Sequence, residues 1–301
     1  MSDSSHTATI NRITSFAISL ATQAGQILTD QFGEPLDIEY KDSEKLDPVT
    51  SVDKNCQKFL NESIQKQFPD HSILGEEDDH DDLIAHDFVW VIDPLDGTKN
   101  YLKGIPTYAC SIGVLYRGVP IAGSIFLPWP CSNEGIVLHA CRDKGAFIGD
   151  NLISATTSKN RGHGSLVGMP GFYTNNRALT KRILSTSDDI RVTGSIAYEF
   201  AMAAKGIFKW SYIPTPRLWD VVAGTLLVRE AGGATMIGHK PRLGWPFLNS
   251  TQWDPIEALV PEWDKREPTL KELRQWSKPM IVGEAETIKY ITEKLGRRPS
   301  F

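Results

Sequence analysis

The segment WVIDPLDGTKN, residues 90–100, decides how the rest of the sequence is interpreted. It opens with apolar residues that are typical of a buried strand. Two carboxylates follow where this strand is expected to end, at Asp93 and Asp96. Between and after them, Pro94 fixes the backbone and Gly97 lets the backbone approach a ligand closely. The segment therefore predicts a strand end that presents two acids to a ligand.

A helix is expected to begin at Thr98, directly after the two acids. The first N–H groups of a helix point outward and bind phosphate, while carboxylate oxygens suit Mg²⁺. Cation ligands and an anion cradle thus lie side by side, as a phosphoryl-transfer site requires. For the motif alone, an Asx turn with a capping aspartate is the alternative.

Three further segments place acids at the ends of expected strands or at the starts of expected helices. The run ILGEE, residues 73–77, ends an apolar strand in two glutamates; PVTSVD, residues 48–53, brings Asp53 to a helix start; and LWDVVAG, residues 218–224, puts Asp220 in a first helical turn. Each has a plain explanation as a capping residue. Four such features in one chain favour a metal site instead.

Apolar periodicity divides the chain into two halves of different type. In residues 1–152 it predicts helices followed by a meander of strands, an α+β pattern: helices at 10–32 and 51–68, and strands at 88–92, 108–116, 120–126, 135–139 and 145–149. In residues 153–301 strands and helices alternate, an α/β pattern: strands at 165–169, 190–193 and 208–213, and helices at 175–185, 195–204 and 219–231. Residues 244–279 are interpreted as an insertion rich in aromatic residues: Trp245, Phe247, Trp253, Trp263 and Trp276. We expect these residues to pack on the body of the protein or on a partner subunit, and a substrate lid is the alternative.

Composition excludes several classes of protein. With 301 residues, 41% hydrophobic and 23% charged, the chain is expected to be globular, with no membrane partner. Four cysteines without CxxC spacing and a polar start favour a cytoplasmic protein. Ten of the 37 acids lie between Lys66 and Lys99, where no Lys or Arg occurs, and Asp78–Asp82 is interpreted as a solvated loop. Basic residues do not gather with aromatic ones, which argues against nucleic acid as a partner.

The combined motifs resemble the inositol monophosphatase superfamily. The matching pieces are Gly75-Glu-Glu77, DPLDGTKN at 93–100 and WDVVAG at 219–224, supported by PVTSVD at 48–53 and GSIA at 194–197. The resemblance covers roughly residues 10–240 and resumes weakly near 281–295. It implies a layered αβαβα sandwich and a Mg²⁺-dependent, Li⁺-sensitive phosphatase that hydrolyses a small phosphate monoester with water. It also implies a homodimer.

The resemblance further implies a role for each matching residue. Glu76, Asp93 and the carbonyl of Leu95 would hold one Mg²⁺, and Asp93, Asp96 and Asp220 a second, with a third sharing Glu76. Asp53 and Thr98 would activate the attacking water, with Glu76 also counted as catalytic through its metal. The remaining contacts would go to the substrate: Gly97, Thr98, Ser195, Asp220 and Arg217.

Some positions depart from the family pattern and leave the substrate open. Ile213 stands where inositol-selective members carry an acid, and Lys99 where Thr or Ser is more usual. Arg217 or Lys209 would suit a second anionic group, as in a 3′-phosphoadenosine 5′-phosphate or sugar bisphosphate phosphatase. A regulatory protein on the same fold is an alternative of another class. Lys41 matches a loop lysine of the family.

Overall fold

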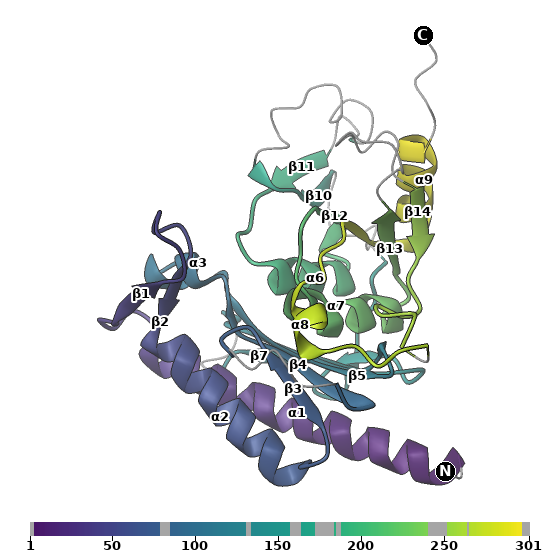
Figure 1. Ribbon diagram of the computed structural model, residues 1–301. Helices are drawn as coiled ribbons and strands as arrows, with labels where there is room; N and C mark the ends of the chain where they lie inside the picture. The colour runs from purple at the N-terminus through teal and green to yellow at the C-terminus, as the bar shows by residue number, and fades with distance from the viewer. Residues whose placement is uncertain are drawn as a thin grey trace.

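The apolar runs of the sequence form two β-sheets, each covered by helices on both faces (Figure 1). The computed structural model describes residues 3–78, 85–130, 134–156, 164–171, 184, 188–239, 252–263 and 265–296. Five layers follow one another: α1 and α2, the first sheet, α6 and α7, the second sheet, and α9. This is the predicted αβαβα sandwich.

The first sheet has seven strands in the order β3-β4-β5-β6-β7-β8-β9. β3 and β4 are parallel, and every later pair is antiparallel. The strands are β3 (Ser72–Gly75), β4 (Phe88–Asp96), β5 (Ala109–Tyr116), β6 (Val119–Leu127), β7 (Ile136–Cys141), β8 (Ala146–Ile148) and β9 (Asn151–Leu152). The predicted meander is therefore confirmed, with β3 at the edge.

The second sheet has six strands in the order β11-β10-β12-β15-β13-β14. The strands are β10 (Ser165–Gly168), β11 (Asp188–Arg191), β12 (Phe208–Ile213), β13 (Ala234–His239), β14 (Gln252–Pro255) and β15 (Met280–Gly283). Only β10 pairs in parallel, with β11 and β12. The chain passes from one sheet to the other between β9 and β10, near residue 152, and a domain boundary there stays a prediction.

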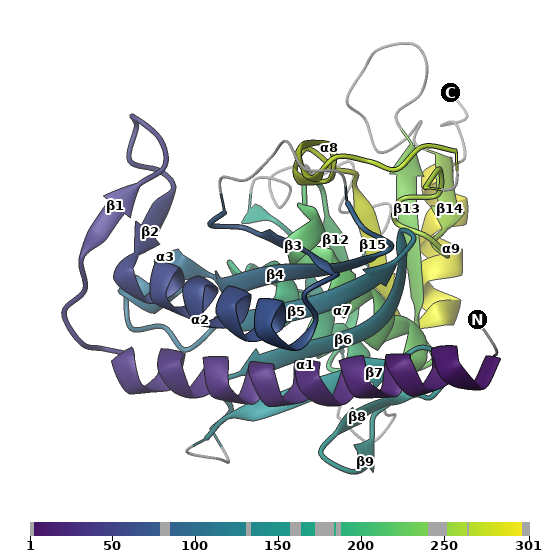
Figure 2. The same ribbon diagram turned by 60° about the horizontal axis from the view of Figure 1, so that its bottom comes forward.

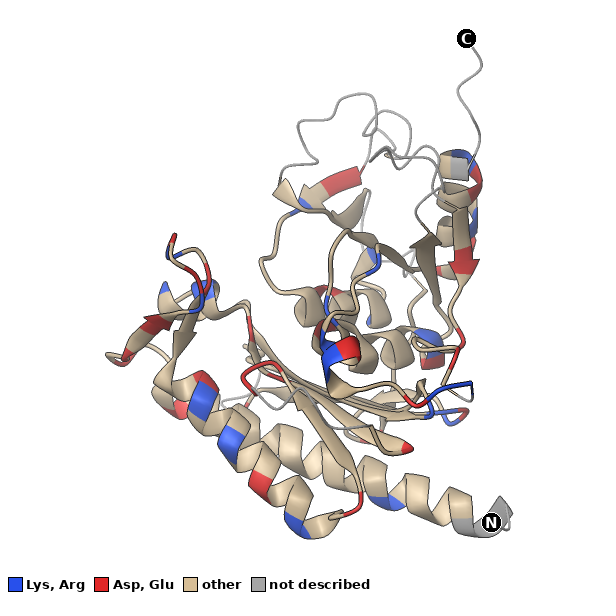
Figure 3. Cartoon of the chain, in the orientation of Figure 1, with Lys and Arg blue, Asp and Glu red and all other residues tan. Residues whose placement is uncertain are grey.

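Long amphipathic helices cover the outer face of the first sheet (Figure 2). They are α1 (Asp3–Gln31) and α2 (Ser51–Gln67), and their apolar sides form one core with β4, β5 and β6. Lys, Arg, Asp and Glu mix on the outward side of α2 (Figure 3), as on a solvated helix face. On the opposite face of the sheet lie α6 (Ile196–Ala204) and α7 (Leu218–Glu230). The helix α9 (Ala285–Gly296) closes the second sheet.

Two glycines allow α7 to approach the first sheet closely. Gly113 of β5 and Gly123 of β6 are direct partners in the antiparallel ladder. A Cβ at Gly113 would lie 2.4 Å from Cγ1 of Val222, and one at Gly123 would lie 2.9 Å from Cα of Ala223. The pair therefore forms a depression that receives α7, two to three residues after Asp220.

The structure corrects several predictions in the first half. The polar segment before Asp53 is not simply a loop, because it contains a hairpin of β1 (Ile38–Tyr40) and β2 (Pro48–Thr50). β4 runs beyond residue 92 to Asp96, and α1 begins before Ile10. Asp78 is not fully solvated: its carboxylate accepts hydrogen bonds from Asn61 and from the backbone of Gly75. Residues 79–82 lie outside the described residues.

The expected insertion at 244–279 is part of the fold. It supplies β14, the edge strand of the second sheet, and the short helix α8 (Leu270–Arg274). Trp253 and Trp263 are buried within the chain itself, which confirms packing on the body for these two residues. Trp245, Phe247 and the predicted helix at 175–185, apart from residue 184, fall outside the described residues. The strands β13, β14 and β15 were not predicted.

Within the described residues, none of the helices combines the length and the apolarity that crossing a lipid bilayer requires.

The glycine pair provides a test of the packing of α7. Gly113→Ala should lower the free energy of unfolding by about 1–3 kcal/mol, because its Cβ would overlap Val222 in a filled core. Gly171→Ala is the control, since among the described residues the nearest heavy atom to its added Cβ is 3.8 Å away. Urea unfolding of the two variants checks this. Equal stability of both would contradict the close approach of α7.

Candidate metal centre

Five acids from distant parts of the sequence converge around the end of β4. Asp93 and Asp96 lie at the end of β4, Glu76 follows β3, Asp220 is in the first turn of α7, and Asp53 is in the first turn of α2. All except Glu76 are buried. Burial, followed by repulsion from Glu76, Asp96, Asp220 and Asp53, raises the pKa of Asp93 well above its usual value. The acids are therefore close enough to repel one another.

The end of β4 forms the local turn that was the plain alternative for its motif. Oδ1 of Asp93 accepts a hydrogen bond of 3.0 Å from the backbone N–H of Leu95, which is an Asx turn. The pairing with β5 is irregular between Asp93 and Asp96. This irregularity lets both aspartates, three residues apart, approach the same space. The Asx turn accounts for the local conformation at Asp93, but it does not explain why several acids are buried together.

Asp96 is held by the start of α6. Its Oδ2 accepts hydrogen bonds from Oγ of Ser195, at 2.9 Å, and from the backbone N–H of Ala197. Ser195 is the N-cap of α6, and its Oγ also accepts from the N–H of Tyr198. Burial outweighs these hydrogen bonds and raises the pKa of Asp96 to about 7. The hydroxyl of Ser195, predicted to contact substrate, therefore donates to a candidate metal ligand here.

Asp220 is placed by the capping of α7. Its Oδ2 accepts a hydrogen bond of 2.6 Å from the backbone N–H of Arg217, the N-cap residue. The carbonyl of the preceding Trp219 accepts from Oγ of Ser111 at 3.2 Å, which ties the helix to β5. Burial and the charge of Asp96 raise the pKa of Asp220 well above its usual value. The side chain of Arg217 itself is exposed.

Glu76 is paired with a lysine from the β1–β2 hairpin. Nζ of Lys41 lies 2.7 Å from Oε1 of Glu76 and 2.7 Å from Oε1 of Glu77. Burial alone would lower the pKa of Lys41, but the two carboxylates raise it overall. Burial and the charge of Glu76 raise the pKa of Glu77 to about 7. The ammonium group of Lys41 therefore bridges Glu76 and Glu77.

Asp53 and Thr98 contact each other, as a water-activating pair must. Oγ1 of Thr98 lies 3.2 Å from Oδ1 of Asp53 and 3.1 Å from the carbonyl oxygen of Leu95, so its single proton is shared between two acceptors. The other oxygen of Asp53 accepts from the backbone N–H and the hydroxyl of Thr50, the N-cap of α2. Burial is the main cause that raises the pKa of Asp53.

Gly97 has a backbone conformation that glycine alone adopts easily. Its φ is 98°, in the left-handed region, where it caps the short helix α3 (Thr98–Leu102). A Cβ there would lie 3.0 Å from the carbonyl oxygen of Thr107 and 3.2 Å from Cβ of Ser195. The predicted cradle at Gly97 and Thr98 thus depends on glycine both for its turn and for the approach of α6.

The carboxylates suit a hard divalent cation in number and chemistry. Glu76 lies near Asp93, Asp96 and Asp220. Burial disfavours the ionised forms of the three aspartates, and a cation would reverse that cost. Among the described residues, no three His, Cys, Asp or Glu side chains are already arranged around a common point. Glu76 faces Lys41, while Asp96 and Asp220 accept from backbone N–H groups. An ion bound by Glu76 would therefore have to displace Lys41.

A cavity of about 560 Å³ lies beside the acids. Its lining includes Lys99, Ser195, Glu199 and Ile213, whereas Arg217 and Lys209 are not among the described residues that line it. Glu199, which the sequence analysis missed, accepts a hydrogen bond of 2.7 Å from Oγ1 of Thr193. Its burial raises its pKa to about 7. In the sequence, the one feature that pointed to Glu199 was its position in the first turn of the helix that follows the GSIA motif.

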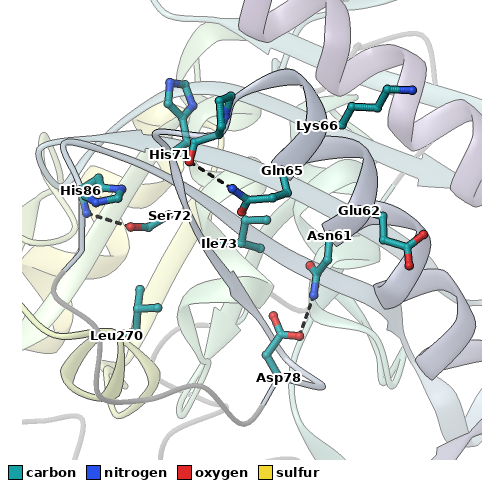
Figure 4. Close-up of a pocket in the computed structure, with 11 residues that line it drawn as sticks. Asn61, Glu62, Gln65, Lys66, His71, Ser72, Ile73, Asp78, His86 and Leu270 are labelled. Carbon is teal, nitrogen blue, oxygen red and sulfur yellow. Dashed lines mark hydrogen bonds between the residues drawn. The ribbon is translucent and has the colours of Figure 1, made fainter.

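A larger cavity, of about 760 Å³, lies beside α2 and β3 (Figure 4). It is lined by α2, β3 and Leu270 of α8. Asn61 donates to Oδ1 of Asp78 across it, and the other oxygen of Asp78 accepts from the N–H of Gly75. The sequence analysis did not predict the hydrogen bond between Asn61 and Asp78, because these residues lie 17 positions apart in the sequence. The cavity contains none of the convergent acids.

Comparisons of this chain with a family model, with related proteins and with solved structures agree with one another. The model of the inositol monophosphatase family matches residues 10–272. The fructose-1,6-bisphosphatase/inositol-1-monophosphatase of Aquifex aeolicus is 31% identical over 73% of this chain and 83% of that protein. The Nus factor SuhB of Escherichia coli is 32% identical over 72% of this chain and 82% of that protein. A solved structure of an IMPase/NADP phosphatase complexed with Mg²⁺ and phosphate shares the fold, with a TM-score of 0.72, 18% identity and coverage of 97% and 98% of the two chains.

The raised carboxyl pKa values predict how stability depends on pH without metal. The unfolded chain releases these protons near pH 4, whereas folded Asp96 and Glu199 hold them until about pH 7. The folded state therefore binds more protons across this range, and its stability should fall as the pH rises through it.

Thermal unfolding in EDTA at several values between about pH 5 and pH 8 measures this effect. Because the ion needs deprotonated ligands, added Mg²⁺ should raise the melting temperature more at the upper end than at the lower. A melting temperature in EDTA that increases steadily with pH would contradict the assignment of buried, repelling acids.

Proposed function

Because this chain belongs to the inositol monophosphatase family, we propose that it is a Mg²⁺-dependent phosphatase that hydrolyses a small phosphate monoester with water. One observation carries the proposal: the acids Glu76, Asp93, Asp96 and Asp220 converge beside a contacting pair, Asp53 and Thr98. A structural role for one buried acid is common. A buried group of acids next to a polar pair and a glycine turn fits phosphoryl transfer.

The proposed ligand assignments are those that the resemblance to the family implies. We propose that Glu76, Asp93 and the carbonyl of Leu95 hold one Mg²⁺, that Asp93, Asp96 and Asp220 hold a second, and that a third shares Glu76. When bound, Mg²⁺ neutralises the charge of the phosphoryl oxygens, acidifies water and stabilises the leaving alkoxide. The barrier to uncatalysed hydrolysis of phosphate monoesters is among the highest known, which explains a need for several charges at one place.

Asp53 and Thr98 are proposed to orient and deprotonate the attacking water. Thr98 donates its one proton toward Asp53 or the carbonyl of Leu95, so its oxygen keeps lone pairs to accept from water. Asp53 has a raised pKa, which makes it a better proton acceptor than an ordinary carboxylate. The capping contacts from Thr50 hold its carboxylate in place. No side chain needs to form a covalent intermediate.

Phosphate oxygens are proposed to bind at the backbone N–H groups of Gly97 and Thr98. Ser195, Asp220 and Arg217 are the further proposed substrate contacts. Ser195 contributes first through Asp96, which it orients. Arg217 is exposed at the N-terminus of α7, so a contact with substrate would require its side chain to turn toward the site.

The cavity beside the acids is proposed to receive the organic part of the substrate. Ile213 and Tyr212 give it apolar walls, and the exposed Lys99 gives it one cation. These features suit an inositol or sugar monophosphate with one face against apolar residues. A sugar bisphosphate or a 3′-phosphoadenosine 5′-phosphate is the alternative, and Lys99 is better placed than Lys209 or Arg217 to meet a second anionic group.

A regulatory role on the same fold is the candidate of another class. It is favoured by the name of the Escherichia coli relative, a Nus factor, which indicates a role for that protein other than hydrolysis. The complete set of metal-ligand candidates and the Asp53–Thr98 contact support catalysis in this chain. A cytoplasmic homodimer stays a prediction.

Substitutions in the centre should separate metal binding from water activation. Asp93→Asn and Glu76→Gln should abolish Mg²⁺-dependent phosphate release while the far-ultraviolet circular dichroism stays unchanged. Thr98→Ala should lower kcat by about 10²-fold or more with little change in KM, because it removes the water-orienting hydroxyl. Asp143→Asn, at an exposed position, is the control. An unchanged kcat in Thr98→Ala would contradict its role.

A substrate panel tests both the class of enzyme and the alternative substrates. Phosphate release would be measured from inositol-1-phosphate, glucose-1-phosphate, fructose-1,6-bisphosphate and 3′-phosphoadenosine 5′-phosphate, with Mg²⁺, with EDTA and with added Li⁺. We expect Mg²⁺-dependent, Li⁺-sensitive release, fastest from a monophosphate. Faster release from a bisphosphate, reduced by Lys99→Gln, would favour the alternative. No release from any compound would contradict the proposed phosphatase.

A further inference from the structure

The short helix α8 brings one arginine to the turn that carries Glu76. Thr269 and Glu272 cap the helix reciprocally, and Leu270 and Leu273 are buried beneath it. The backbone N–H of Ala85 donates to the carbonyl of Pro268 at 2.9 Å, which joins this segment to the chain that enters β4. α8 therefore contacts the edge strand β3.

Arg274, the last residue of α8, donates to two carbonyls in this turn. One guanidinium nitrogen lies 3.2 Å from the carbonyl oxygen of Glu76, and the other lies 3.1 Å from that of Gly75. The planar fork of arginine suits two adjacent acceptors, and its charge strengthens both hydrogen bonds. The backbone of a candidate metal ligand is thus fixed by a residue almost 200 positions later.

The same turn is held from its other side by the first half of the chain. The carboxylate of Asp78 accepts from the N–H of Gly75 at 3.1 Å and from Asn61 of α2 at 2.8 Å. The N–H of Glu76 donates to the carbonyl of Ile92 in β4 at 3.0 Å. The carbonyl of Gly75 also accepts from the N–H of Asp78 at 3.4 Å, so Arg274 adds a second hydrogen bond there and one at the carbonyl of Glu76.

Arg274 also contacts the residue that precedes Asp220. Its guanidinium carbon lies 5.5 Å from the ring centroid of Trp219, within the range of a cation–π contact. Trp219 is in the first turn of α7 and is tied to β5 through Ser111. One side chain therefore touches the immediate neighbours of two acids, Glu76 and Asp220, that come from different elements.

We propose that Arg274 is a positioning residue that sets the Mg²⁺ affinity of the centre by fixing the Glu76 turn relative to α7. The inference rests on the proposed phosphatase function, because it assumes that Glu76 and Asp220 bind the ion. Glu76 must release Lys41 when the ion enters. If Arg274 fixes the backbone of Glu76, the side chain can turn from Lys41 to the ion while its Cα stays in position. Residues that support metal ligands in this way typically change metal affinity by about 10–100-fold when they are replaced.

A charge effect alone would give the opposite result, so the two causes are separable. A guanidinium near the centre repels an incoming cation, and its removal would then tighten binding. Arg274→Lys keeps the charge but loses the fork, whereas Arg274→Gln loses both. Positioning predicts weaker binding in both variants. A pure charge effect predicts wild-type binding in Arg274→Lys and tighter binding in Arg274→Gln.

The experiment measures Mn²⁺ binding directly by electron paramagnetic resonance, with Mg²⁺ as competitor and without substrate. Phosphate release against Mg²⁺ concentration follows on the same proteins. We expect Arg274→Lys and Arg274→Gln to weaken Mn²⁺ binding by about tenfold and to raise the half-saturating Mg²⁺ concentration similarly. At saturating Mg²⁺, kcat should return to within about threefold of the wild type, because the reacting groups are intact.

Two controls in α8 separate positioning from stability. Lys271→Gln removes one positive charge from an exposed position of the same helix, and it should bind Mn²⁺ as the wild type does. Leu273→Ala removes a buried side chain, so it should lower the melting temperature in EDTA without a comparable loss of affinity. Wild-type affinity in both Arg274 variants would overturn the inference and leave the phosphatase proposal standing. Failure of the wild type itself to bind Mn²⁺ or Mg²⁺ would overturn both.

Discussion

The mutual repulsion of buried carboxylates is the constraint on which the rest of this structure depends. Asp93, Asp96 and Asp220 are withdrawn from water and lie near Glu76, and their pKa values rise for both reasons. Without a cation such a group of acids resists ionisation and costs stability. Hydrogen bonds from Ser195, Ala197, Arg217 and Leu95 offset only part of that cost. In the proposed function, a bound divalent cation would supply the remainder.

The fold holds these acids in place by fixing the backbone at each one. Asp53 and Asp220 are each the third residue of their helix. Each carboxylate accepts a hydrogen bond from the backbone N–H of its N-cap residue, which is Thr50 for Asp53 and Arg217 for Asp220. The Gly113–Gly123 depression sets how near α7 lies to β5 and β6. The β1–β2 hairpin brings Lys41 to the outer acids, and α8 brings Arg274 to the turn behind them. Each acid thus has a separate backbone support, so the group does not depend on any single loop.

Much of this arrangement was predictable from short-range sequence signals. DPLDGTKN and WDVVAG mark strand ends and helix starts, so the positions of the acids followed from local patterns, whereas the layer order followed from the resemblance to the family. Local signals failed where the partner lies far along the chain. Arg274 supports Glu76 across almost 200 residues, and β14 joins the second sheet from a segment interpreted as an insertion. Lys41 was identified by resemblance alone, because a polar segment gives no sign that it pairs into a hairpin.

The most direct test of the account is calorimetric titration of Mg²⁺ into the metal-free protein near pH 7, in two buffers with different enthalpies of protonation. If Asp96 and its neighbours hold protons that the ion displaces, the observed heat must differ between the buffers in proportion to the protons released. The account predicts saturable binding with such release, and loss of both in Asp220→Asn. Binding with the same heat in both buffers, or unchanged binding in Asp220→Asn, would contradict it.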